Sequence, residues 1–555
     1  MGEGPAIAGS RISSYAKTYE GVLGHFKIST IDILILLNVN MGCNMSFKKS
    51  ITILFVLLIL LNILIRIPSV PHENGNDSFM LHTLANSVTQ FGEARWWLNT
   101  YSVFGMYSYS YGSALPFLLS GIQQLTNIEM ETSVWVMSVP LGLISMFSAF
   151  IMAGEIKRDF SFKFIFALFY SISQGILQFT VWNGSSRGIF LVLLPLFIYI
   201  LIKENVSVIK KTLLLLMLFV YLRSAHNFSY FLVPVVGSYI LSVLFIKYDL
   251  FKLNDKYSRY YHFIYIAILF SAMFIPFVTG LFIVGSRYQA FLSSFITMTR
   301  YTGPLIFFAF AGLMYLIFKQ DKNHKDWFIL IVTAGFTPMF YSLAYGPFIL
   351  LLPIIYLISI SFSNLFLMLN KSKLIHIIVI GLILSSVVFS SYYMHFRTGS
   401  SSESWYMDDR TNVAGIWTRS AFEENTRILT PGGETWRMTA IANGHAVFPT
   451  IPPVALAYGF VSEEEVLENT LTSELVSTAY FFDGPYVQKD GTDSWGKYAW
   501  ISYFDIEDKR TINLIEEYDL KYAAFDTSGK STLGSDIDSR KNKIYDNSRI
   551  TFYPL

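Results

Sequence analysis

Two acidic residues and two histidines lie close together in the segment His72-Glu73-Asn74-Gly75-Asn76-Asp77-Ser78-Phe79-Met80-Leu81-His82. A carboxylate can act as the general base for an incoming hydroxyl group, or it can hold a divalent cation such as Mg²⁺ or Mn²⁺ against a phosphate. Both tasks need an oxygen ligand near developing charge. Asp77 is the first candidate for either role, Glu73 is a second candidate catalytic acid, and His82 is a candidate metal ligand.

Each of these residues also has an ordinary structural interpretation. Asp77 could cap the helix that follows it, because aspartate is favoured at the N-cap and near the positive end of the helix dipole. Glu73 could be a solvated acid in a loop, and His82 could pack on a helix face. The residue types alone leave these alternatives open.

The composition places these residues in a membrane protein. Of the 555 residues, 53% are hydrophobic and only 14% are charged, which is too apolar for a soluble enzyme of this length. The net charge of +2 is too small to indicate the excess of positive charge that binds nucleic acid. The single cysteine, Cys43, excludes an intrachain disulfide and a thiolate metal cluster.

Long apolar stretches recur along the chain, and each can span a bilayer. They predict about eleven transmembrane helices, at residues 50–67, 133–153, 164–182, 188–202, 212–222, 228–246, 262–284, 303–318, 327–344, 347–368 and 374–393. The apolar stretch 111–125 is short and contains glycines and a proline, so we expect a re-entrant or interfacial helix there. Residues 1–44 are interpreted as an extension that precedes a second possible start at Met45.

The distribution of charge predicts the orientation of the chain. Lysine-rich loops are expected in the cytoplasm by the positive-inside rule, and they fall at residues 48–49, 157–163, 203–211, 247–259, 319–325 and 371–373. The N-terminus is then cytoplasmic, and the first loop, 68–131, lies outside the cell membrane. Most apolar stretches contain no charge, whereas ion-coupled transporters usually carry one near the midplane. Chemistry at the outer surface is therefore favoured.

The first loop is also expected to hold its acid at a defined depth. The spacing of leucine and alanine from Asp77 onward predicts an amphipathic helix that lies along the membrane. Trp96 and Trp97 would follow it in the headgroup region.

This loop resembles that of the membrane-embedded family C glycosyltransferases, which use lipid-phosphate sugar donors. Residues 76–82 are similar to the acidic motif, followed by histidine, of the archaeal oligosaccharyltransferase catalytic subunit, and residues 104–109 are similar to a later stretch of that subunit. The eleven-span layout resembles protein O-mannosyltransferases. The resemblance covers the first half of the membrane region. It implies a transferase that moves a sugar or glycan from a polyprenyl-phosphate donor to a glycan, lipid or protein acceptor at the outer face.

Under this resemblance, Arg187, Arg223 and Arg287, with His226 beside Arg223, are expected to bind the donor phosphate. A guanidinium can hold a phosphate through two parallel hydrogen bonds and stabilise it as a leaving group. The alternative is that each arginine anchors a helix end at the lipid headgroups.

The sequence departs from the family pattern in two places. The oligosaccharyltransferase signature Trp-Trp-Asp-Tyr-Gly is absent, and neither residues 434–437 nor residues 493–496 replace it. The later external loop, 182–187, contains no carboxylate. Neither asparagine-directed transfer nor a complete metal site is therefore implied.

The composition changes at about residue 397, where charged residues, prolines and glycines replace the apolar runs. We predict a transmembrane domain at 45–396 and a soluble extracytoplasmic α/β domain at 397–555, with a core large enough to fold without disulfides. Strands are expected at 427–430 and 522–526, helices at 463–478 and 512–518, and a hairpin at 545–553. This domain would bind the acceptor or cover the site.

Two other functions share these features. A transporter or flippase for lipid-linked glycans would need alternating access instead of a reacting carboxylate. A non-catalytic envelope-assembly protein would need neither.

Overall fold

The structure is a computed structural model that describes residues 47–107, 109–248, 255–278, 287–343, 345–368, 373–397, 407–430, 433–448, 452–466, 501–527 and 531–555. The predicted extension, 1–44, lies outside these residues. The chain divides into two compact units, Met1–Leu57 and Leu58–Leu555. All contacts described below belong to the second unit. The boundary expected at residues 396–397 stays a prediction, because elements on both sides of it belong to that unit.

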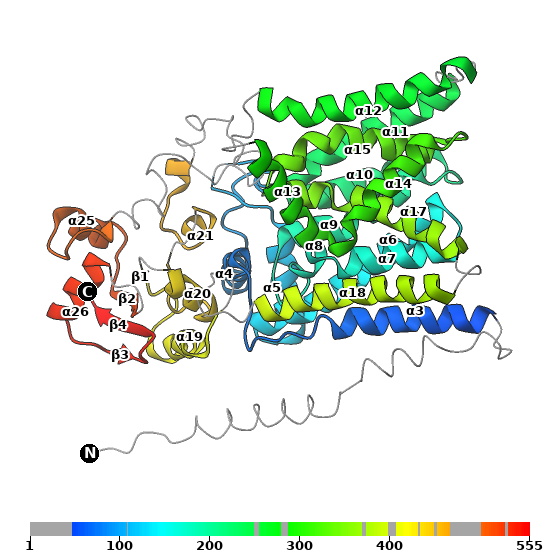
Figure 1. Cartoon of the computed structure of the whole chain (residues 1–555). Coiled ribbons are helices and arrows are strands. Elements are labelled where there is room, and N and C mark those ends of the chain that lie inside the picture. Colours follow the sequence, from blue (N-terminus) through cyan, green and yellow to red (C-terminus); the bar gives the residue numbers. More distant parts are fainter. Residues whose placement is uncertain are drawn as a thin grey trace. The chain divides into compact units, whose positions relative to one another are not determined.

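Helices dominate the described chain up to residue 397 (Figure 1). They are α3 (Phe47–Leu64), α4 (Asn76–Phe91), α5 (Ala114–Thr126), α6 (Met130–Ile156), α7 (Phe160–Ile172), α8 (Gln174–Leu177), α9 (Ser186–Ile202), α10 (Val208–Ala225), α11 (Leu232–Lys247), α12 (Asp255–Val278), α13 (Arg287–Thr302), α14 (Phe307–Phe318), α15 (His324–Phe336), α16 (Gly346–Ile349), α17 (Leu351–Met368) and α18 (Lys373–Arg397). Short 3-10 helices precede α11 (η1, Asn227–Phe231) and α14 (η2, Pro304–Ile306) and follow α15 (η3, Thr337–Tyr341).

Helices occupy most of the described part of every predicted apolar stretch, although the stretch 164–182 runs past the end of α8 at Leu177. Among the described residues, three helical segments are long and apolar enough to cross a membrane: Met130–Ile156, Asn227–Lys247 and Leu374–His395. A fourth is formed if Ala290–Thr302 and Pro304–Phe318, which meet at 114°, make one broken span. Several of the other apolar helices, such as α7 and α9, are shorter. The count of eleven spans and the orientation stay predictions.

The outer faces of several helices carry exposed apolar side chains. On α10, Leu213, Leu216 and Met217 are 56%, 57% and 63% exposed. Similar residues stand out on α11, α12, α14 and α18, such as Val233, Phe263, Phe310 and Ile377. Exposed apolar surfaces of this extent are unstable in water and are covered by lipid in membrane proteins. These surfaces agree with the membrane class that the composition predicts.

Three of the predicted cytoplasmic loops meet at one end of the helices. Glu155, at the end of α6, pairs with Lys203 after α9 and with Lys325 in α15, at 3.4 Å in each case. Glu204 in turn lies 3.2 Å from Lys325 and 3.4 Å from His324. The basic loops 157–163, 203–211 and 319–325 therefore share one end, as the alternation of charge requires.

The helix expected after Asp77 is present as α4, but it is not amphipathic in its surroundings. Its residues from Ser78 to Val88 are all buried, polar ones included. Helix α4 contacts α5 and α6 on one side, and α20 (Gly433–Ile441) and α21 (Pro452–Ala457) of the C-terminal part on the other. The prediction of an amphipathic helix with a face open to solvent or lipid is therefore wrong, and its orientation along the membrane stays a prediction. Trp96 is fully buried as well, which corrects its assignment to the headgroups, whereas Trp97 is 49% exposed.

The C-terminal part combines helices with one small sheet, shown in yellow to red in Figure 1. Its elements are α19 (Asp409–Ala421), β1 (Ile428–Leu429), α20 (Gly433–Ile441), α21 (Pro452–Ala457), α25 (Lys509–Glu517), β2 (Tyr522–Asp526), α26 (Thr532–Arg540), β3 (Tyr545–Asp546) and β4 (Ile550–Pro554). The strand order is β1-β2-β4-β3, with β1 parallel to β2 and the other pairs antiparallel. The expected strands and hairpin are therefore present. Most of the helix expected at 463–478 lies outside the described residues.

Buried residues of α4 and of the C-terminal part form one apolar cluster, which includes Leu84, Val88, Met438 and Val454. Two hydrogen bonds cross the same contact. The Asn86 amide donates to the Ala440 carbonyl at 2.8 Å, and the Tyr458 hydroxyl donates to the Thr83 carbonyl at 3.3 Å. The first-loop helix is thus held between the membrane helices and the C-terminal elements.

Candidate functional site

Asp77 lies in the first turn of α4, where the helix dipole favours a negative charge. The N-cap of α4 is Gly75, with φ +95°, so the alternative that Asp77 caps the helix is wrong. Its side chain is exposed, and no hydrogen bond or ion pair joins it to another described residue. Asp77 is therefore accessible to a ligand.

Glu73 is fully buried, so its interpretation as a solvated loop acid is wrong. One carboxylate oxygen accepts a hydrogen bond from the Ser78 hydroxyl, and the other lies 2.7 Å from Nδ1 of His82. The backbone N–H of Glu73 donates to Oε1 of Glu131 at 3.0 Å. Glu73 and His82, which the sequence places nine residues apart, therefore meet inside the protein.

The segment around Glu73 is bonded to the loop that precedes α9. Asn74 donates through its backbone N–H to the Trp182 carbonyl at 3.1 Å and through its side chain to the Val181 carbonyl at 3.2 Å. The Gly184 N–H donates to the Ser78 hydroxyl oxygen at 2.5 Å. The two segments are in close contact at three points.

His72 bridges two carboxylates from different elements. Its Nδ1 lies 3.1 Å from Glu131 of α6, and its Nε2 lies 3.0 Å from Asp409 of α19. Burial by itself lowers the pKa of His72, but the hydrogen bonds and negative charges of Glu131 and Asp409 outweigh it, and the net pKa is raised above the ordinary value.

Three of the predicted phosphate-binding residues, Arg187, Arg223 and His226, interact electrostatically, and the two arginines are called the cationic group below. Burial, together with the positive charges of Arg187 and Arg223, lowers the pKa of His226 well below its ordinary value, so this ring is neutral at pH 7. Arg223 is only 4% exposed and donates to the Asn227 side chain and, at 3.0 Å, to the Tyr230 hydroxyl. Arg187, the second residue of α9, is partly exposed.

Aromatic rings surround the guanidinium of Arg187. Its central carbon lies 5.7 Å from the ring centre of Phe179, 5.6 Å from that of Phe228 and 5.4 Å from that of Phe348. Such distances allow cation–π attraction, which holds a guanidinium in place without neutralising it.

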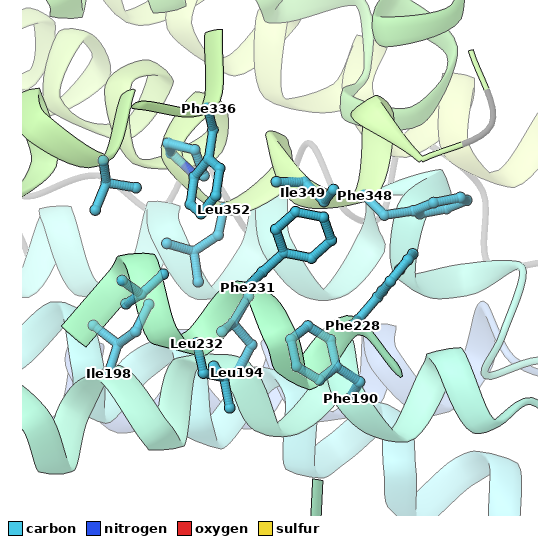
Figure 2. A pocket seen from close by; sticks show the side chains of 13 residues that line it. Phe190, Leu194, Ile198, Phe228, Phe231, Leu232, Phe336, Phe348, Ile349 and Leu352 are labelled. Carbon is cyan, nitrogen blue, oxygen red and sulfur yellow. The ribbon is translucent and has the colours of Figure 1, made fainter. Parts of the chain in front are cut away.

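Phe228 and Phe348 also line an apolar cavity, shown in Figure 2. The other lining residues come from α9, η1, α11, α15, α16 and α17, and all are apolar: Phe190, Leu194, Ile198, Phe231, Leu232, Val235, Val332, Phe336, Ile349, Leu352 and Pro353. In the figure the two rings lie at one end of the labelled group. Phe228 and Phe348 therefore line the apolar cavity and also flank the Arg187 guanidinium.

The remaining predicted site residues are not brought together. Arg287 is the first residue of α13, but its side chain lies outside the described part of the chain. Asp77 is exposed whereas His82 is buried against Glu73, and the described residues include no group of three or more His, Cys, Asp or Glu that could hold a metal ion. Asp77 and His82 alone therefore do not fit a divalent cation.

Some residues of the site had no signal in the sequence. Phe348 comes from a loop-flanked short helix far along the chain from Phe228, and only the fold pairs them. Ser78 in α4 and Gly184 before α9 are common residue types in unrelated segments. The spacing of Ser78 after Glu73 could at most have suggested a local hydrogen bond.

The fold of the chain is similar to that of solved structures of membrane-embedded family C glycosyltransferases. The chain is similar to the archaeal oligosaccharyltransferase AglB from Archaeoglobus fulgidus in complex with an inhibitory peptide and a dolichol-phosphate, with a TM-score of 0.54 and 12% identity over 87% of this chain and 70% of that one.

Two further structures are similar as well. The A. fulgidus oligosaccharyltransferase in complex with Zn and sulfate matches with a TM-score of 0.51 and 13% identity over 90% of this chain and 72% of that one. ArnT from Cupriavidus metallidurans, bound to undecaprenyl phosphate, gives a TM-score of 0.46 and 9% identity over 92% and 98% of the two chains. No protein-family model and no curated protein sequence matches the chain.

Proposed function

We propose that the protein is a glycosyltransferase that moves a sugar or glycan from a polyprenyl-phosphate donor to an acceptor at the outer face of the cell membrane. The acceptor would be a glycan, a lipid or a protein. The proposal includes the predicted topology, with a cytoplasmic N-terminus and an extracytoplasmic C-terminal part.

The observation that supports this proposal most is that the same two aromatic side chains line the apolar cavity and contact the Arg187 guanidinium. A polyprenyl phosphate is an apolar chain that ends in an anion, so its binding site needs an apolar channel that leads to a positive charge. Phe228 and Phe348 line the apolar cavity and also flank the Arg187 guanidinium. Arg223 and the neutral His226 are near this guanidinium, because Arg187 and Arg223 both lower the pKa of His226.

The reaction would use the residues as follows. An acceptor hydroxyl attacks the anomeric carbon of the sugar while the bond from that carbon to the phosphate oxygen breaks, and its electron pair stays on the phosphate. Asp77 takes the proton of the hydroxyl group. Arg187 and Arg223 stabilise the negative charge that grows on the leaving phosphate. No step depends on a metal.

A divalent cation, Mg²⁺ or Mn²⁺, stays a candidate cofactor, with Asp77 as its candidate carboxylate ligand. It would need further ligands from the acceptor, the donor or water. Comparing transfer in EDTA with transfer in added Mg²⁺ or Mn²⁺ tests this part of the proposal.

Binding of dolichyl phosphate to the full chain in lipid nanodiscs tests the donor site. We expect Arg187→Gln to weaken binding about 10- to 100-fold, because it removes a charged hydrogen-bond donor to the phosphate. Arg95→Gln is the matched control, because Arg95 also stacks on a ring, that of Phe91, at 3.4 Å but lies outside the cationic group. Equal binding by the two variants would argue against this donor site.

The Asp77→Asn variant distinguishes the proposed glycosyltransferase from the alternative function of a flippase. The variant keeps the size of the side chain but cannot accept the proton, so it should lose transfer of radiolabelled sugar from dolichyl-phosphate mannose or dolichyl-phosphate glucose while still folding. A flippase should keep most of its transport in this variant. Sugar transfer by this variant at the wild-type rate would show that Asp77 is not the general base.

A further inference from the structure

We infer that the Glu73–Ser78–Gly184 contact is a positioning device that fixes the acid at the start of α4 relative to the arginine at the start of α9. This inference rests on the proposed function, in which Asp77 serves the acceptor and Arg187 serves the donor phosphate. Neither Glu73 nor Ser78 touches a substrate in this account.

Ser78 joins the two helix starts through a single hydroxyl group. The hydroxyl donates to Glu73 and its oxygen accepts the Gly184 N–H at 2.5 Å. Ser78 directly follows Asp77 in the chain. On the other side, Ser185 caps α9 by accepting the Gly188 N–H at 3.3 Å, and Arg187 is the second residue of that helix. The link from acid to arginine is therefore short and consists of well-defined hydrogen bonds.

Glu73 gives this link its rigidity. Its carboxylate is fully buried and is held from the other side by His82 at 2.7 Å, while its backbone N–H is held by Glu131 at 3.0 Å. A buried carboxylate that lost these partners would be left without hydrogen bonds at a large cost in free energy, so it fixes the Ser78 hydroxyl in one orientation. The burial of Glu73 also keeps it away from the reacting groups.

The remaining contacts allow the link to be removed without loss of the fold. The two hydrogen bonds from Asn74 to the Val181 and Trp182 carbonyls do not involve the Ser78 hydroxyl, so we expect them to remain when it is removed. Transfer between two bound groups is sensitive to small displacements, because a shift of about 1 Å can cost about 100-fold in rate. The link should therefore affect the reaction step more than the binding of the donor.

Ser78→Ala tests the inference, with Ser87→Ala as the matched control. Ser87 is also buried on α4, but its hydroxyl donates to the Leu84 carbonyl of the same helix. We expect Ser78→Ala to lower kcat about 10- to 100-fold with unchanged KM for the donor and unchanged binding of dolichyl phosphate. Ser87→Ala should keep the wild-type kcat, KM and binding of dolichyl phosphate. In the Asp77→Asn background, Ser78→Ala should add little, because the link acts through Asp77.

Three outcomes would overturn the inference: equal kcat for the two serine variants, a loss that falls on KM, or a full additional loss in the Asp77→Asn background. Hydrogen exchange supplies a readout that needs no sugar transfer. Peptides covering 73–78 and 181–188 should exchange faster in Ser78→Ala than in Ser87→Ala. If wild-type protein consumes no donor, the proposed function fails, and equal exchange in the two variants would separately refute the positioning link.

Discussion

The Arg66 guanidinium is fully buried, and every partner it has among the described residues is neutral. It donates to the Thr180 hydroxyl at 3.1 Å, to the backbone and side-chain oxygens of Asn62 at 2.9 Å, and to the Ser171 carbonyl at 2.8 Å. A buried charge without an anion is stable only if its donors are used. Arg66 therefore depends on an exact fit of the helices around it.

Gly142→Ala should disturb this fit. A β-carbon at position 142 would lie 1.8 Å from Nε of Arg66, so the guanidinium must move and lose hydrogen bonds. We expect the free energy of unfolding to fall by about 3 kcal/mol, measured by denaturant unfolding in detergent. Gly237→Ala on α11 is the control, since a β-carbon there meets nothing within 4 Å. Equal stability of the two variants would contradict the role of Gly142.

Individual side chains could be predicted from the sequence only in part. The acid and the arginines were found because charged residues are rare in an apolar chain, and Arg187 and Arg223 lie near enough to His226 to lower its pKa. The burial of Glu73 could not be predicted, because it depends on Gly184 and Glu131 from other segments. A pattern in one segment does not show which other segment covers it.

The positions of the helices follow the apolar pattern of the sequence where hydrophobicity alone determines them. Helices coincide with the apolar stretches, but α13 was missed, because Arg287–Thr302 mixes polar and apolar residues. Helix α4 shows a different limit. Its polar side chains would suggest a solvent face, yet His82 binds Glu73 and Asn86 binds the Ala440 carbonyl. Tertiary partners overrode the surface position that the local pattern predicted.

The start of α4 can be tested as an element. Gly75 has φ +95°, and a β-carbon there would lie 2.3 Å from the Asn183 side chain. Gly75→Ala should therefore push the 73–78 segment away from the loop before α9 and lower the rate of sugar transfer at least about tenfold, measured with the same donors.

Gly92→Ala at the other end of α4 is its matched control. Gly92 also has a positive φ, +73°, and its ψ of 3° places it in the left-handed helical region, where a residue with a side chain costs about 1 kcal/mol. Gly75, with ψ 128°, lies outside that region, so its backbone strain in the alanine variant is larger. Only Gly75 has a neighbour in the way, because nothing lies within 4 Å of a β-carbon at Gly92. An equal effect of the two variants on transfer would mean that backbone strain, and not the contact with Asn183, explains the loss.

On the scale of the whole molecule, the sequence separates the membrane helices from the C-terminal part, but it does not show how the two meet. The change of composition at about residue 397 and the sheet strands were predictable from local patterns. The contact between α4 and the C-terminal helices was not, because it joins residues such as Thr83 and Tyr458 that no local pattern relates.

His72 joins these parts through charge, so the stability of the whole molecule should depend on pH. Glu131 of α6 and Asp409 of α19 face its two ring nitrogens, and the Asn412 amide of α19 lies 3.4 Å from Glu131. Burial opposes the protonated ring, but the two acids outweigh it and raise the pKa of His72. The stabilisation is then fully present below the unfolded pKa of about 6.5 and is lost as pH rises through the higher folded value.

We therefore expect the melting temperature in detergent to fall as pH rises above about 6.5, and this slope to flatten in His72→Gln, because glutamine carries no titrating charge between the two acids. His445→Gln is the control, since the ring of His445 binds the Phe422 carbonyl at 2.9 Å instead of a carboxylate. It should keep the wild-type slope. A His72→Gln profile as steep as that of the wild type would show that other groups set the pH dependence, and that His72 holds α6 and α19 together by packing rather than by charge.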